Sequence, residues 1–441
     1  MKLRLLLTFG LILSASTPAF ALKLNRYTGV SAEFAASQNT NASTNLDAAY
    51  YNPAGVVFGY EGFAIRFTDQ ATFGMVSFER GENSDDDFGV SAISPMIMAT
   101  YRQDKIGFFL SSGLVGGGVT RFAGDHPVFD ENRRYVIDSI NESDLVAELV
   151  PGGGGDGEAL ITDARFANNE LSAMSAYIGT NVGVAYQVSP AISVAVGMKA
   201  MYTFGNLDLG GDIEVFNDGL GWFYEEKDVK LKAKQNGSGV AGILGIHMKP
   251  TDALTIALRA ETLTKISVTT TQVEDTADII EEESINRSDI APTIAWGLDY
   301  QVSDRWSIQS SGAYYFNTSA EYGPLLGFDV SDGIKDDWEI GLGTRFKVSE
   351  TLKLSTGALY FKSGFTEEIR TSNRFSMDAL FVGAGAEIGL SKHWSIIAAA
   401  MGMIYGDTKT GLAGETATQP PAQTTIDQDY LVLSLDVTYY L

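Results

Sequence analysis

Three basic residues, Lys199, Arg259 and Arg345, are the side chains of this 441-residue chain that are best placed to hold an acidic group. Each lies in a run where apolar residues occupy alternate positions, and the basic residue falls on the other face of the expected strand. An Arg can hold a carboxylate through two parallel hydrogen bonds, whereas a Lys offers a point charge. We therefore predict that these cations face the inside of a β-structure, where they could contact the acidic end of a ligand.

The same cations could instead be neutralised by the protein itself. Glu261 lies two residues after Arg259 on the same face of the expected strand. Arg345 could pair with Glu339 or with the N-terminal segment. No acid adjoins Lys199 on its face of its own strand, so we interpret the arginines as structural first and Lys199 as the open candidate.

The sequence shows no cluster of residues typical of a catalytic or metal site. The histidines, His126, His247 and His393, are dispersed along the chain, and there is no Cys. A metal centre, a catalytic triad and a disulfide framework are therefore not expected. The glycine run at 151–157 lacks the Gly-Lys-Ser/Thr ending of a phosphate-binding loop, so we interpret it as a flexible linker. We predict no enzyme activity, no cofactor and no metal.

The stretch at 45–55, Asn-Leu-Asp-Ala-Ala-Tyr-Tyr-Asn-Pro-Ala-Gly, carries the strongest local signal. Pro53 fixes its own φ and disfavours helical angles at the residue before it, and Gly55 permits a positive φ. We predict that a turn closes a plug-like segment here, and that it consists of Asn52, Pro53, Ala54 and Gly55.

The elements that must position these residues belong to an exported chain. Lys2 and Arg4 precede an apolar run, and Ala19-Phe20-Ala21 matches a signal-peptidase site, so residues 1–21 are a predicted signal peptide. No later apolar run approaches the ~20 residues that a membrane helix needs. The mature chain is therefore either soluble or a β-barrel.

Composition favours the barrel. The chain has 47 Gly, 19 Tyr and 24 Phe, and its mean hydropathy is only +0.01 although 45% of its residues are hydrophobic, as alternating strands require. Removal of Lys2 and Arg4 with the signal peptide changes the formal charge from −24 to −26. That charge argues against nucleic acid or anionic lipid as an electrostatic partner of the whole protein, and we interpret it as solvated loops.

Tight polar turns set the strand count. Each turn separates two runs of roughly 10–15 residues in which apolar and polar residues alternate. The turns are at 102–105, 189–191, 249–252, 303–305, 349–351 and 391–393. These hairpins give twelve strands, and runs starting near Gly62 and Tyr430 bring the count to fourteen, an even number as such barrels require. Longer outer connections are expected at 79–90, 117–172, 208–236, 272–289, 318–335, 364–375 and 407–428.

The predicted fold is thus all-β: a 14-stranded antiparallel transmembrane β-barrel over 60–441, with an N-terminal plug or hatch over 22–59 inside it. Asp47 of the hatch would then be available to pair with the inward-facing Arg66. Aromatic residues recur at one depth near the tight turns, as in an interfacial girdle; they are Tyr101, Tyr186, Tyr300, Trp306, Phe346 and Trp394. The alternative, a soluble β-sandwich, would have shorter strands of ~5–6 residues.

One known family shares these features. The stretch Tyr51-Asn52-Pro53-Ala54-Gly55, preceded by Gly29-Val30-Ser31 and small residues over 32–48, resembles the plug of the FadL/TodX-type outer-membrane transporters. Stretches at 183–197, 241–245, 257–261, 296–315, 340–346 and 374–375 are similar to that family's hairpins in the same order. The opening at 22–27 and the long connection at 117–172 depart from the family pattern.

The resemblance implies passive transport of long-chain fatty acids or other hydrophobic compounds across the outer membrane of a Gram-negative cell. A complete monomeric barrel is expected, with outer-membrane lipid and lipopolysaccharide around it and no nucleic-acid partner. The acidic stretch at 82–87 could bind cations that bridge lipopolysaccharide, or be a solvated loop. The alternatives are a structural or adhesive barrel without transport, and a porin for polar solutes.

Alternate residues of each expected strand face the lumen, and many of these residues are apolar, unlike those of a water-filled porin. The inward candidates for ligand contact are Met96, Met98, Phe109, Met201, Leu359, Phe361, Phe381, Met401 and Met403. Each of them could equally be ordinary filling against the hatch.

Two further sites are suggested near the outer side. The third outer connection is unusually apolar and could be a capture groove, or could pack onto a neighbouring loop; the groove would consist of Phe216, Leu220, Trp222 and Phe223. Short helices are predicted at 135–150 and 159–171. Glycines crowd the third strand, where they predict either a lateral gap in the barrel wall or a simple strand end; they are Gly113, Gly116, Gly117 and Gly118.

Overall fold

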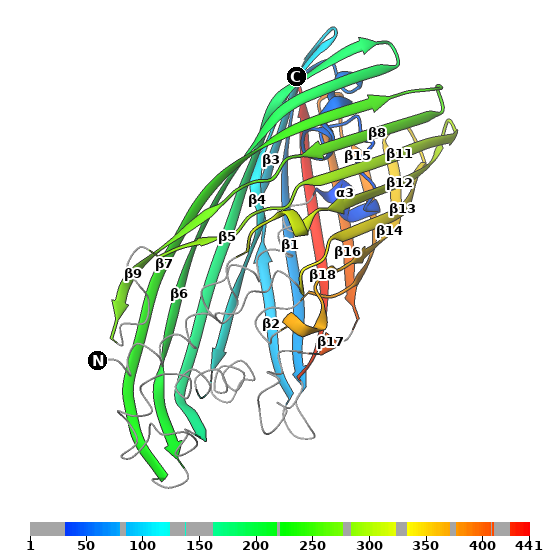
Figure 1. Cartoon of the computed structure of the whole chain (residues 1–441). Coiled ribbons are helices and arrows are strands. Elements are labelled where there is room, and N and C mark those ends of the chain that lie inside the picture. Colours follow the sequence, from blue (N-terminus) through cyan, green and yellow to red (C-terminus); the bar gives the residue numbers. More distant parts are fainter. Residues whose placement is uncertain are drawn as a thin grey trace.

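The computed structural model describes residues 31–79, 85–123, 137, 162–217, 221–276, 284–322, 333–370, 376–406, 408–409 and 424–441. The chain forms a closed antiparallel β-barrel around a short helical segment (Figure 1). The predicted signal peptide and the first residues of the predicted hatch lie outside the described residues, so these boundaries stay predictions. No helix in the described ranges is long and apolar enough to cross a membrane.

Within the ranges that the structure describes, the barrel has fourteen strands, as predicted. Ten are continuous: β1 (Gly62–Glu79), β4 (Ile106–Ala123), β5 (Asp163–Ser189), β6 (Ile192–Asn217), β7 (Gly221–Met248), β12 (Trp306–Tyr315), β13 (Asp337–Lys347), β14 (Leu352–Lys362), β15 (Ala379–Gly389) and β18 (Thr425–Tyr440). The other four are interrupted once each: β2 (Asp85–Ile93) with β3 (Met96–Gln103), β8 (Leu254–Glu261) with β9 (Ser267–Asp275), β10 (Ser284–Arg287) with β11 (Thr293–Ser303), and β16 (Trp394–Tyr405) with β17 (Thr408–Lys409).

The first and last strands close the barrel. β1 and β18 pair from Ala64 opposite Tyr440 to Glu79 opposite Thr425. All the predicted tight turns connect neighbouring strands; β5, for example, ends at Ser189 and β6 begins at Ile192. This pairing of the first strand with the last removes the two free edges that an open sheet would expose to the membrane. The short 3-10 helices η3 (Asn317–Ser319) and η5 (Glu367–Ile369) lie in connections at the opposite end.

The strands are much longer on one side of the barrel than the sequence predicts. β5, β6 and β7 have 27, 26 and 28 residues, whereas β11 to β16 have 10 to 12, and the long strands form a projecting wall (Figure 1). The expected outer connections at 117–172 and 208–236 are therefore partly strand. The helix predicted at 159–171 is wrong from Asp163 onward, because β5 begins there; the helix predicted at 135–150 lies outside the described residues, residue 137 excepted.

Side chains alternate between the two surfaces of the wall. On β18, Leu431, Leu433 and Leu435 are 46–47% exposed, whereas the intervening Val432 and Ser434 are at most 5% exposed. The aromatic residues of the predicted girdle all point outward and are 42–51% exposed. An outward apolar surface with an aromatic rim is typical of a barrel that spans a membrane.

A charge in this outward band should destabilise the barrel. Leu244, which is 60% exposed, lies between Val240 and Ile246 among the outward apolar residues of β7, so Leu244→Arg should lower the free energy of unfolding by about 2–4 kcal/mol. Asn236→Arg, on the same face of β7 but nearer its outer end, should cost about 0–1 kcal/mol. Urea unfolding in phospholipid vesicles measures both; equal costs would contradict the placement of the membrane.

Candidate functional site

The first hatch helix, α3 (Ala32–Ser37), packs against the inside of β14, β15 and β16. Ser31 caps its N-terminus, because the Ser31 hydroxyl oxygen accepts from the Phe34 N–H at 3.1 Å. Close approach needs small residues on both sides. A Cβ on Gly383 of β15 would lie 1.9 Å from the Ala35 carbonyl oxygen, so only glycine fits there.

The predicted Asn-Pro turn fastens the hatch to the wall. Helix α4 (Ala48–Tyr51) ends at Asn52, and the 3-10 helix η2 (Pro53–Phe58) begins with Pro53 at its first position, where the missing N–H costs nothing. The Asn52 side-chain oxygen accepts from the Ala54 N–H, and its amide donates to the carbonyl oxygens of Ile246 and Leu258 at 3.1 and 3.2 Å. One side chain therefore shapes the turn and binds two neighbouring strands.

Arg66 of β1 is the centre of an ion cluster that holds the hatch. Its guanidinium contacts the Asp47 carboxylate, as the sequence suggests, and lies 3.2 Å from Asp436 of β18. All three side chains are at most 2% exposed. Arg66 Nε also donates to Thr438 Oγ1 at 2.9 Å, and Asp436 accepts from the Ala32 N–H at 3.0 Å. The cluster thereby joins the hatch to the two strands that close the barrel.

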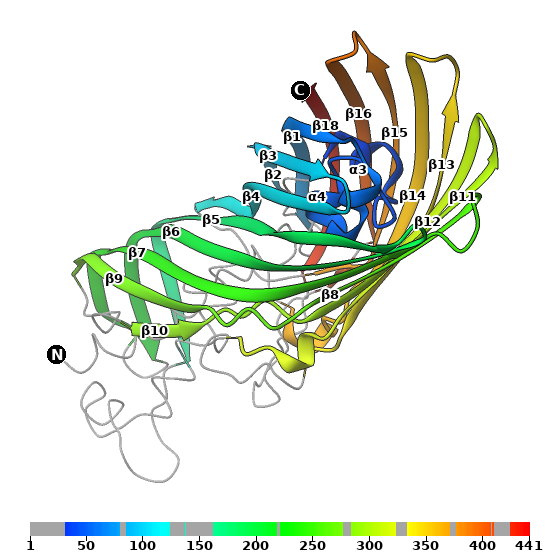
Figure 2. The same ribbon diagram turned by 90° about the horizontal axis from the view of Figure 1, so that it is seen from above.

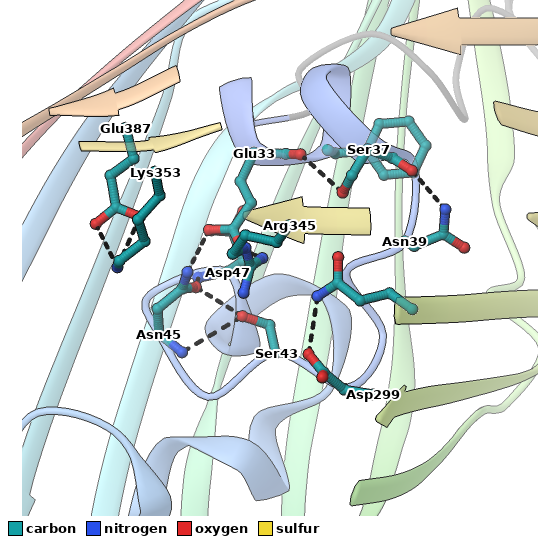
Figure 3. A network of polar contacts seen from close by, with 12 residues as sticks. Glu33, Ser37, Asn39, Ser43, Asn45, Asp47, Asp299, Arg345, Lys353 and Glu387 are labelled. Carbon is teal, nitrogen blue, oxygen red and sulfur yellow. Dashed lines mark hydrogen bonds and ion pairs between the residues drawn. The ribbon is translucent and has the colours of Figure 1, made fainter. Parts of the chain in front are cut away.

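Glu33 of α3 makes a second ionic contact with the wall (Figure 3). Its carboxylate contacts Arg345 of β13 and the amide of Asn45. Burial raises the pKa of Glu33, but Arg345 and Arg66 outweigh it and hold that pKa at about 2. Because the pKa is lowered, this contribution to stability is present above the ordinary value of 4.5 and is lost as the pH falls toward about 2. Arg345 is therefore occupied by the hatch.

Lys199 has an acidic partner on another strand, although no acid adjoins it on its own strand. The Lys199 ammonium lies 2.8 Å from Glu261 Oε2, and Arg259 contacts the other oxygen of the same carboxylate. The pairing is across strands: Lys199 lies on β6 and Glu261 on β8, with β7 between them. A search for acids along the strand of Lys199 alone could not find it. The expected pairing of Arg259 with Glu261 is confirmed.

A cavity of about 140 Å³ lies beside this trio and the hatch. Among the predicted ligand-contact residues, Lys199, Met201 and Arg259 line it. The hatch contributes Phe34, Tyr50 and Tyr51, which were not predicted to contact a ligand because the direction of their side chains follows from the fold of the hatch. The structure therefore brings three of the predicted residues together around one space.

The other inward candidates are buried on the lumen side but do not line this cavity. Met96, Met98 and Phe109 pack in one apolar cluster with Leu46, Val56 and Val57 of the hatch region. Those on the inner side of β14, β15 and β16 are at most 4% exposed; they are Leu359, Phe361, Phe381, Met401 and Met403. Their burial is as expected for side chains that fill the barrel interior.

The predicted capture groove is not a loop. Phe216 belongs to β6 and lies opposite Trp222 of β7, so the two strands continue through most of this connection as a hairpin. The alternation in this segment extends the strands, and its apolar residues belong to the projecting wall. Leu220 and the side chains of Trp222 and Phe223 lie outside the described part of the structure.

The wall is interrupted beside the predicted lateral gap. β3 and β4 pair from Gln103 opposite Ile106 up to Met96 opposite Gly113. Beyond that point, in the described ranges, β2 pairs with β1 and β4 pairs with β5, and no ladder joins β2 to β4. A Cβ on Gly113 would lie 2.6 Å from the Pro95 carbonyl oxygen, where the second strand breaks.

A bulge bends β4 directly above this break. The register between β4 and β5 shifts between Leu114 and Gly116, and Gly117 has a φ of 137°, which favours glycine. Gly118 continues the pairing with β5. The glycines thus lie where the strand turns away from its former neighbour.

Comparisons with known proteins define the class of this fold. No protein-family model matches the chain, and no curated protein matches it. A solved FadL homologue from Pseudomonas aeruginosa is 14% identical, with a TM-score of 0.65 over 93% of this chain and 98% of that one. The toluene transporter TodX of Pseudomonas putida is 12% identical, with a TM-score of 0.59 over 92% and 98%. The CymD monoaromatic hydrocarbon channel is 11% identical, with a TM-score of 0.52 over 94% and 97%.

These likenesses confirm the predicted fold. The chain has the fold of an outer-membrane β-barrel of the FadL/TodX type, with a helical segment inside a fourteen-stranded wall (Figure 2).

Loss of the Asn52 side chain should loosen the hatch. Asn52→Ala removes two hydrogen bonds to the wall and the cap of η2, so the free energy of unfolding should fall by about 1–3 kcal/mol. Protease added from the side of the tight turns should then cleave residues 45–55 faster than in the unaltered protein. Asn206→Ala, on the exposed face of β6, should change neither quantity. Equal cleavage of both variants would contradict the role of Asn52.

Removal of the central arginine should have a larger effect. Arg66→Met leaves Asp47 and Asp436 buried without a counter-charge, which should cost about 3–5 kcal/mol. The matched control is Arg121→Met, because Arg121 and Glu170 form an exposed pair at 69% and 54% exposure, worth about 0–1 kcal/mol. Chemical unfolding of both variants measures the difference, and a small cost for Arg66→Met would show that the cluster does not hold the hatch.

Proposed function

We propose that the chain is a FadL/TodX-type transporter that carries hydrophobic compounds passively across the outer membrane. In this proposal residues 1–21 are a signal peptide, 22–59 the hatch and 60–441 a monomeric barrel. Outer-membrane lipid and lipopolysaccharide surround the wall. The hatch residues are Asn52, Pro53, Ala54, Gly55 and Asp47. The fold that the chain shares with the FadL homologue and TodX supports the proposal.

The interruption of the wall beside Gly113 is the observation that carries this function. A compound that moves along the lumen meets the hatch, which is fastened by Asn52 and Arg66. An apolar compound gains nothing from reaching aqueous periplasm, because the bilayer core lies directly beside the wall. The missing ladder between β2 and β4 gives a shorter route sideways into the membrane. We assign the lateral gap to Gly113, Gly116, Gly117 and Gly118.

The cavity beside the hatch is the proposed ligand site of this route. Lys199, Met201 and Arg259 line it together with aromatic residues of the hatch. Its mixture of apolar walls and a few convergent polar groups is typical of small-molecule sites.

Uptake in whole cells tests the function. Cells that produce the chain should take up labelled oleate or labelled toluene faster than cells that lack it. Uptake of a polar solute should be the same in both kinds of cell. If cells with and without the folded barrel take up oleate and toluene at the same rates, a structural or adhesive role is favoured. Faster uptake of the polar solute would indicate a porin.

Closing the gap should block uptake. Ile93 of β2 and Val119 of β4 lie on the two strands beside the break and face outward at 66% and 59% exposure, so Cys at both positions is accessible to bifunctional thiol reagents of graded length. Because the chain has no Cys of its own, only the introduced thiols react. The cross-linked protein should lose most of its uptake. The same treatment of Cys at Tyr101 and Phe108, which already lie opposite each other in the paired ladder, should leave uptake intact. Unchanged uptake with the first pair would rule out the lateral route.

A further inference from the structure

The size of the cavity beside the hatch limits what can occupy it. At about 140 Å³ it is close to the ~150 Å³ of an engineered apolar cavity that holds one benzene molecule. A single ring with one small substituent therefore fills it. A long acyl chain could place only its end there.

Three aromatic rings of the hatch line the cavity. The rings of Phe34 and Tyr51 are stacked, with centroids 5.5 Å apart and planes 4° from parallel. Tyr50 meets Tyr51 edge-on, with centroids 5.0 Å apart. A flat aromatic ligand can extend such an arrangement through the same stacked or edge-to-face contacts.

The lining of the cavity also carries a buried positive charge. Lys199 and Arg259 share the single carboxylate of Glu261, and the three side chains are 13%, 11% and 10% exposed. The trio has a net charge of +1. Glu339, a second acid, also lines the cavity and takes part in an interaction. The ion pairs of Lys199 and Arg259 both go to one carboxylate, that of Glu261, so an anion beside the two cations is favoured.

Arg259 also retains an unused donor. Its Nε is buried and has no hydrogen-bond partner among the described residues. A guanidinium N–H of this kind is suited to a carboxylate oxygen, since charge-assisted hydrogen bonds are the stronger ones. The unused donor and the net charge of the trio therefore point to the same kind of group.

We propose that this cavity binds single-ring carboxylates of the benzoate class. The carboxylate accepts from Arg259 Nε beside Lys199, and the ring packs against Tyr50 and Tyr51. A plain hydrocarbon ring leaves the charge of the trio unmatched, and a long fatty acid leaves most of its length outside the cavity. The proposal rests on the proposed function in that it names the ligand class of the same site.

Glu261 sets the strength of this site without contacting the ligand in the proposal. Its carboxylate holds Lys199 and Arg259 together and reduces their combined charge from two to one. Glu261→Gln keeps the shape of the side chain but raises the net charge of the trio to +2. Binding of an anion should then become tighter, whereas a purely structural role for Glu261 predicts weaker binding or none.

Direct binding to the purified barrel in detergent micelles tests the proposal. Calorimetry with benzoate, methyl benzoate, toluene and octanoate at neutral pH should show the tightest binding for benzoate. Arg259→Met should weaken benzoate binding about 10- to 100-fold, the loss of one charge-assisted bond, and should leave methyl benzoate almost unaffected. Lys353→Met is the matched control, because Lys353 pairs with Glu387 at 3.0 Å and does not line the cavity.

The outcomes separate this proposal from the transport function. Equal binding of benzoate and its methyl ester, octanoate binding as tight as benzoate, or no gain for Glu261→Gln would each overturn the ligand class. If Arg259→Met fails to fold, the ester comparison and Glu261→Gln still decide. Selective benzoate binding without any cellular uptake would support this site and reject the transport proposal.

Discussion

The contact between Arg66 and the carboxylates of Asp47 and Asp436 is the interaction on which the rest of the structure depends. Arg66 lies on the first strand, Asp436 on the last, and Asp47 in the hatch, so one buried guanidinium connects barrel closure to the placement of the plug. Desolvation of such charges is expensive, and their mutual attraction repays it only when the geometry is well satisfied. The cluster therefore specifies one position for the hatch more than it adds stability.

Much of the fold follows from local rules that a sequence displays directly. Tight turns need Asp, Ser or Pro at fixed positions, and the inner and outer surfaces need period-two alternation, so both strand count and facing could be predicted. Strand length could not, because alternation continues beyond the membrane: Phe216 looked like part of an apolar loop but lies in β6 opposite Trp222. Only the pairing partner tells a strand from a loop there.

The site was less predictable for the same reason. The alternation of side chains along its strand correctly placed Lys199 on the inner side. Its acidic partner, Glu261, lies two strands away in space and 62 residues away in sequence. Such a partner depends on the register between strands, which side-chain alternation does not fix. The link of Asp47 to Arg66 could be suggested because few inward residues carry charge near the start of the barrel. The third member, Asp436, required knowledge of how the barrel closes.

The cavity and the hatch are energetically linked, because Phe34, Tyr50 and Tyr51 belong to both. Any ligand that binds there with the hatch in place, and not otherwise, stabilises the hatched state by mass action. Because such a ligand binds only the hatched state, its apparent affinity falls in proportion to the fraction of molecules that keep the hatch in place. Displacement of the hatch would therefore release a ligand from the cavity as well as open the barrel. A route that leaves the hatch fixed and uses the break beside Gly113 avoids this coupling, since passage then requires no loss of the contacts that Asn52 and Arg66 make.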